Sequence, residues 1–103
     1  MSYEKPLIIY KNFEPDKESK NFFFQMMQKT ELEAPSDSNI KLTVKRIRNG
    51  YKAYCRLASS TLNFGCHSHS NDLHQLCLSI EKSVKRKIEA WRKNRVLNWA
   101  EAI

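Results

Sequence analysis

Two cysteines and three histidines lie close together in this sequence, and their side chains are of the types that bind zinc or perform thiol chemistry: Cys66, His67, His69, His74 and Cys77. A structural zinc site needs four ligands that point to one centre. In an alternating strand Cys66 points inward and His67 outward, and Cys77 belongs to an apolar helical stripe, so a shared centre requires a distorted strand end. We therefore expect no metal and no other cofactor.

Catalysis by one of these thiols would need more than a nearby histidine. The cysteine would have to be partly exposed, beside a histidine base and a carboxylate that orients the base, and Asp72 is the single acid nearby. The sequence also lacks suitably spaced carboxylate pairs, a Gly-rich phosphate loop and a Gly-x-Ser-x-Gly turn. These observations favour a non-enzymatic protein that has no small-molecule substrate and keeps its cysteines in the core.

Positive charge is the second chemical feature, and it is unevenly distributed. Residues 1–37 carry five Lys against seven Asp or Glu, whereas residues 38–103 carry thirteen Lys or Arg against four, so the formal charges are −2 and +9. Six of these cations lie between Lys41 and Arg56, where Asp and Glu are absent. Such a basic surface binds phosphates with salt-dependent affinity and little sequence readout. RNA is the expected partner.

The elements that must position these cations follow from hydrophobic periodicity. Residues 7–10 form a short apolar run typical of a strand, and residues 15–30 have helical spacing with Pro and acidic residues at the start. Apolar residues then alternate in three runs, around residues 40–44, 53–57 and 62–66, and Asn49-Gly50 between the first two predicts a hairpin with a type I′ turn.

Residues 72–94 have an apolar stripe at helical spacing that begins after the cap residues Asn71 and Asp72. The resulting order, β-α-β-β-β-α, predicts an α+β domain in which two helices cover one face of a four-stranded sheet. We expect a single domain over residues 1–103, with its core at about 7–95. The apolar tail, residues 96–103, either docks on the body or a partner or frays.

The compartment follows from what the sequence contains and lacks. The N-terminus has no secretory signal pattern, and no apolar run approaches the ~20 residues of a membrane span. Three cysteines, an odd number, argue against a disulfide framework and favour a reducing environment. We therefore expect a soluble cytoplasmic protein without a membrane partner.

Aromatic residues offer a second way to hold nucleic acid, by stacking on bases. Tyr51, Tyr54 and Trp91 lie near the basic segments, although the helical spacing of Trp91 favours the core. The sequence lacks the strand signature of an RNA recognition motif, the Gly-x-x-Gly loop of a KH domain and a paired metal-binding finger. Those modules are excluded.

The element order and the segment from Leu62 to Lys93, LNFGCHSHSNDLHQLCLSIEKSVKRKIEAWRK, resemble the hibernation-promoting factor and ribosome-associated inhibitor family, also called sigma-54 modulation protein-like. Members of that family have this element order, an Asp-bearing start of the second helix, and a second helix that becomes basic midway. The resemblance covers about residues 7–95 and is to the short form, without a C-terminal dimerisation domain. The first helix departs from the family pattern, because it is short and rich in Phe and Met.

The resemblance implies binding to the small ribosomal subunit and its rRNA near the decoding region. There the domain would obstruct mRNA and tRNA, block translation and hold ribosomes in hibernation. The residues that match the family's basic helix and strands, and that are the implied RNA-binding set, are Lys45, Arg56, Lys82, Lys85, Arg86, Arg92 and Lys93.

Two other functions remain open from the residues alone. One is a double-stranded-RNA-binding-like module for another structured RNA, which also predicts a basic face. The other is a protein-protein adaptor that uses its exposed sheet face or the tail around Trp99. Reversing the charge at Lys85 and Arg86 distinguishes an adaptor from an RNA-binding protein. An adaptor would still bind its partner, whereas an RNA-binding protein would lose its RNA.

Overall fold

Four strands form one mixed sheet in the computed structural model, which describes the backbone of residues 7–102 and the side chains of residues 7–94. The strands are β1 (Leu7–Lys11), β2 (Asn39–Ile47), β3 (Gly50–Ala58) and β4 (Asn63–Ser70). They lie side by side in chain order, with β1 parallel to β2 and the other neighbours antiparallel. The strands predicted from alternating apolar residues are confirmed.

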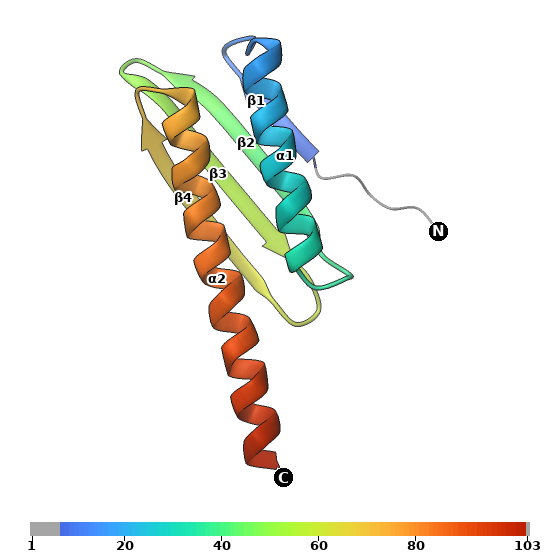
Figure 1. Cartoon of the computed structure of the whole chain (residues 1–103). Coiled ribbons are helices and arrows are strands. Elements are labelled where there is room, and N and C mark those ends of the chain that lie inside the picture. Colours follow the sequence, from blue (N-terminus) through green and yellow to red (C-terminus); the bar gives the residue numbers. More distant parts are fainter. Residues whose placement is uncertain (1–6, 103) are drawn as a thin grey trace.

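Two helices, α1 (Lys17–Glu33) and α2 (Leu73–Ala102), cover one face of this sheet (Figure 1). Asp16 caps α1, where its side chain accepts a hydrogen bond from the backbone N–H of Ser19 at 2.9 Å. Asp72 does the same for α2, accepting from the backbone N–H of Gln75 at 3.0 Å. Both carboxylates lie at the positive end of a helix dipole. The expected α+β fold is confirmed.

The second helix is longer than its apolar stripe predicts. The expected end was near residue 94, but α2 continues to Ala102 because no Gly or Pro interrupts it. Its last turns extend beyond the sheet (Figure 1). The side chains of residues 96–103, for which docking or fraying was expected, lie outside the described part. No helix in that described part is long and apolar enough to cross a membrane.

The core lies between the helices and the inner face of the sheet. Its fully buried large side chains come from α1, α2 and the two central strands: Phe23, Met26, Met27, Leu42, Val44, Cys55, Leu57, Leu76, Ile80, Val84 and Ile88. Trp91 is half-buried and packs against this cluster, in agreement with its helical spacing. Among the described side chains of α2, Trp91 is the last that packs on the core.

The turn between β2 and β3 differs from the expected type I′. Ile47 pairs with Gly50, so Arg48 and Asn49 are the central residues of the turn. A type I′ turn needs positive φ at both central residues, but among the described residues only Asn12 and Gly50 have positive φ, at 69° and 131°. The hairpin is present, and the type I′ prediction is wrong because Gly50 belongs to the strand rather than to the turn centre.

Candidate nucleic-acid interface

The strand cations lie on the face of the sheet that neither helix covers. On β2 and β3 the apolar residues point to the helices, so the alternate residues point away, and these include the predicted Lys45 and Arg56. Lys45 lies directly opposite Lys52, and Arg56 lies directly opposite Lys41. The four strands contain no Asp or Glu. This open face, defined by the outward residues of β1–β4, therefore carries positive charge without any carboxylate.

The cations on the open face are aligned across the strands. The pairing register places Lys11, Lys45, Lys52 and His69 in one row over all four strands. Neighbouring strands are about 4.8 Å apart, so this row is about 14 Å long. Like charges directly opposite each other destabilise a sheet. A row without a single carboxylate is the arrangement expected where phosphates supply the counter-charge.

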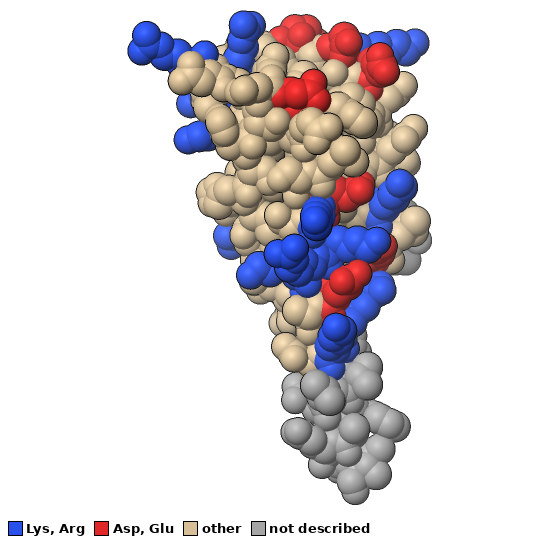
Figure 2. All heavy atoms as spheres, turned by 60° about the vertical axis from the view of Figure 1, so that its left-hand side comes forward, with Lys and Arg blue, Asp and Glu red and all other residues tan. Residues whose placement is uncertain are grey.

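The cations of α2 divide into two groups. Lys82, Arg86 and Lys93 are exposed, and each lies two positions from a residue that packs on the core, which places it on the far side of the helix. We call these three the outer α2 cations. Figure 2 shows Lys and Arg gathered on this part of α2, with Asp or Glu side chains among them. The outer α2 cations form an exposed, mainly basic ridge.

Lys85 and Arg92 instead lie on the side of α2 that faces α1. Lys85 lines a small hollow of about 110 Å³ between the helices together with Lys29, Glu33 and Glu81. The Nη2 atom of Arg92 donates a hydrogen bond to the backbone carbonyl of Glu33 at 2.9 Å. That carbonyl belongs to the last turn of α1, where a cation is favoured by the helix dipole. Lys85 therefore lies close to carboxylates, and Arg92 is held by a carbonyl of α1.

The predicted RNA-binding residues therefore lie on different faces of the domain. Lys45 and Arg56 lie on the open face, whereas the α2 cations lie on the opposite, helical side of the sheet. Among the described residues a single ion pair forms, between Lys20 and Glu14 at 2.7 Å. None of the seven predicted cations is neutralised in this way.

Four basic residues near these surfaces are absent from the predicted set: Lys11, Lys41, Lys52 and Lys87. The first three alternate with the inward-pointing residues of their strands, as Lys45 and Arg56 do, so they lie on the open face as well. This alternation is visible in the sequence and could have identified them. Lys87 lies close enough to Cys66 of β4 to affect its pKa. Burial raises the pKa of Cys66, and the positive charge of Lys87 partly offsets this rise. Helical spacing alone does not predict that Lys87 lies near β4, because this depends on how α2 is placed along that strand.

The cysteines and histidines do not assemble into a reactive site. Burial raises the pKa of Cys55 to about 12 and that of Cys77 to about 11, and all three cysteines are buried and unbridged. His67 and His69 lie on the open face, whereas His74 packs against Phe22 with ring centroids 5.3 Å apart. In the described part of the chain, no three His, Cys, Asp or Glu side chains form a group that fits a metal ion.

Comparison with known proteins identifies the fold. No protein-family model and no curated protein sequence matches this chain. The N-terminal domain of Protein Y from Thermus thermophilus aligns with a TM-score of 0.70 and 7% identity, over 85% of this chain and 99% of that domain. A ribosomal subunit interface protein from Coxiella burnetii aligns with a TM-score of 0.67 and 6% identity, over 84% and 97%. The resemblance indicated by the sequence is confirmed at the level of the fold.

Proposed function

We propose that this protein is a non-enzymatic, cytoplasmic factor that binds the small ribosomal subunit and its rRNA, blocks translation and holds ribosomes in hibernation during stress. The observation that carries the proposal is the shared fold over 97% of a ribosomal subunit interface protein. The positions of the cations support it independently. The outer α2 cations are exposed on a helix, where their side chains can reach the phosphates of a bound RNA.

The binding mode follows from the chemistry of these side chains. Lys and Arg hold phosphate oxygens through charge-assisted hydrogen bonds, and they do so on any RNA sequence. Specificity for the ribosome must then come from shape, that is, from how the long α2 and the open face of the sheet fit the folded rRNA. A domain held there would inhibit translation by occupying the path of mRNA or tRNA, so it needs no catalytic residue.

Co-sedimentation with purified ribosomal subunits tests this proposal. We expect the protein to pellet with small subunits at low salt, to be released as salt rises, and to pellet poorly with large subunits. Failure to pellet with small subunits at low salt would contradict the proposal. A plain RNA duplex added as competitor tests the double-stranded-RNA alternative, which predicts that the duplex displaces the protein as well as rRNA does.

A matched pair of charge variants tests whether the α2 surface makes the contact. Lys82→Glu with Arg86→Glu reverses two outer α2 cations, and Lys17→Glu with Lys29→Glu makes the same change in net charge on α1. The α2 variant should lose ribosome binding, and the α1 variant should retain it. Equal retention by both variants would favour the adaptor, whose partner does not depend on this charge.

A further inference from the structure

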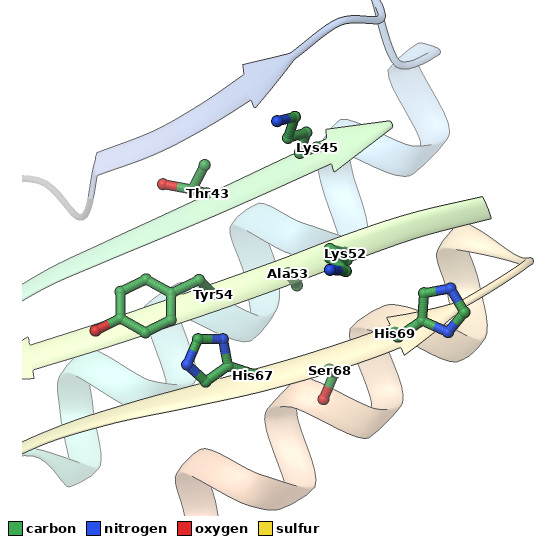
Figure 3. Close-up of a pocket in the computed structure, with 8 residues that line it drawn as sticks. All are labelled: Thr43, Lys45, Lys52, Ala53, Tyr54, His67, Ser68 and His69. Atoms are coloured by element: carbon green, nitrogen blue, oxygen red, sulfur yellow. The ribbon is translucent and has the colours of Figure 1, made fainter. Parts of the chain in front are cut away.

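The open face of the sheet contains a shallow hollow that neither helix reaches. It has a volume of about 440 Å³, and the side chains around it come from β2, β3 and β4: Thr43, Lys45, Lys52, Tyr54, His67 and His69 (Figure 3). Figure 3 shows them on one side of the sheet, with the helices behind the strands. This hollow combines cations with aromatic rings.

Tyr54 and His67 form the aromatic floor of this hollow. They lie directly opposite each other on β3 and β4, with ring centroids 4.6 Å apart and ring planes 43° from parallel. His67 is exposed and Tyr54 is half-buried. Two aromatic rings of this kind, side by side on a strand pair, present π-surfaces to solvent at the centre of a basic face.

Gly65 explains why the Tyr54 ring lies along the sheet. A Cβ atom placed on Gly65 would come within 2.6 Å of the Tyr54 hydroxyl oxygen and within 3.0 Å of its ring. The ring therefore occupies the space that any other side chain at position 65 would fill. A glycine inside a strand costs stability, and an aromatic ring laid across it restores part of the packing. The result is a tyrosine held flat on an otherwise open surface.

The cations are arranged on both sides of this aromatic pair. Tyr54 pairs with Thr43 across β2 and β3. The next outward pair along the strands in one direction is Lys45 with Lys52, and in the other direction it is Lys41 with Arg56. Successive rows on one face of a strand are about 7 Å apart. A base stacked on Tyr54 would thus have basic side chains within reach of the phosphates before and after it.

We propose that the open face binds single-stranded nucleic acid, with unpaired bases stacked on Tyr54 and His67 and the flanking phosphates held by Lys45, Lys52 and Arg56. Bases in a duplex are already stacked on one another, and their flat surfaces are inaccessible to a sheet. Aromatic rings interleaved with cations fit a single strand instead. This binding goes beyond the proposed function because it requires neither the ribosome nor the outer α2 cations.

Fluorescence anisotropy of the full chain with labelled oligonucleotides of about 12 nucleotides tests the proposal. We expect the single-stranded RNA to bind, and Tyr54→Ala to weaken its binding more than it weakens binding of a duplex of the same sequence. Tyr54→Ala should weaken single-strand binding about 5- to 100-fold, and Tyr54→Phe should retain it, because stacking needs the ring and not the hydroxyl. A DNA strand of the same sequence shows whether the 2′-hydroxyl contributes.

Further variants separate a failure of this proposal from a failure of the proposed function. Gly65→Ala pushes the Tyr54 ring from its place without removing it, and it should also weaken single-strand binding. Unchanged single-strand binding by Tyr54→Ala, with thermal unfolding showing that the variant is folded, would overturn the proposal. The proposal would also be overturned if Lys82→Glu with Arg86→Glu lost single-strand binding while the open-face variants kept it, because the nucleic acid would then bind on α2. Co-sedimentation of the same variants with small subunits reports on the proposed function separately.

Discussion

Lys45 of β2 lies directly opposite Lys52 of β3, on the face of the sheet that neither helix covers. Lys11 on β1 and His69 on β4 extend the same row, and no strand supplies a carboxylate. Directly opposed like charges weaken strand pairing, so this arrangement opposes folding and favours an anionic partner. The domain therefore contains a conflict between stability and binding that can be measured.

Lys52→Glu should stabilise the free protein, because Lys45 would then face an opposite charge. We expect the free energy of unfolding to rise by about 0.2–1 kcal/mol at low salt, with a smaller gain at high salt. Urea denaturation at two salt concentrations measures this, with Lys52→Gln as the uncharged comparison. A loss of stability in Lys52→Glu that exceeds the loss in Lys52→Gln would show that the opposed lysines do not repel.

The two glycines should respond differently to alanine. Gly50 has φ of 131°, and a Cβ there would meet the backbone carbonyl oxygen of Ser70 at 2.6 Å, whereas at Gly65 the close atoms belong to the movable Tyr54 side chain. Gly50→Ala should lower the free energy of unfolding by about 1–3 kcal/mol, and Gly65→Ala should lower it by much less. Thermal unfolding of both variants measures the difference, and equal losses would argue against the backbone clash at Gly50.

Arg92 and Lys93 are adjacent cations with different expected roles. Arg92 donates to the carbonyl of Glu33 and joins α2 to the end of α1, whereas Lys93 points to solvent. Arg92→Ala should lower the free energy of unfolding by about 0.3–1 kcal/mol and have a small effect on RNA affinity, and Lys93→Ala should do the reverse. Denaturation and small-subunit binding of both variants test this. A larger affinity loss in Arg92→Ala would place Arg92 in the RNA contact.

The three cysteines should be inert in the folded protein. Burial raises the pKa of Cys55 to about 12 and that of Cys77 to about 11, so neither forms a thiolate near neutral pH. A thiol reagent at pH 8 should modify none of them until the chain is unfolded. As pH rises, the unfolded chain loses these protons first, so the free energy of unfolding should fall above about pH 9. Rapid modification of one cysteine in the folded state would reopen the thiol-chemistry alternative.

The fold could be predicted from sequence because its local signals agree with one another. Apolar residues alternate on β2, β3 and β4 and repeat at helical spacing on α1 and α2, and polar residues separate the elements. The turn type could not be predicted, because it depends on whether Gly50 lies in the strand or in the turn centre. The length of α2 was predicted too short, because the prediction followed the apolar stripe to about residue 94, whereas the helix backbone continues to Ala102.

The candidate site was only partly predictable, for a similar reason. Strand parity correctly placed Lys45 and Arg56 away from the core, and helical spacing placed Lys82, Arg86 and Lys93 on the exposed side. Helical spacing does not reveal which exposed side faces α1, and that contact engages Arg92 and brings Lys85 close to carboxylates. The Tyr54–His67 pair depends on the register between β3 and β4, which the separate strand patterns do not specify.

The salt dependence of binding to purified small ribosomal subunits tests the central claim most directly. Lys82→Gln, Arg86→Gln and Lys93→Gln together remove three phosphate contacts without adding repulsion. The slope of log affinity against log salt should then fall in magnitude by about 1 for each contact removed. We expect a slope shallower by about 2 to 3 in this variant, and an unchanged slope in Lys17→Gln with Lys29→Gln. A wild-type slope in the α2 variant would contradict the claim that α2 contacts the rRNA backbone.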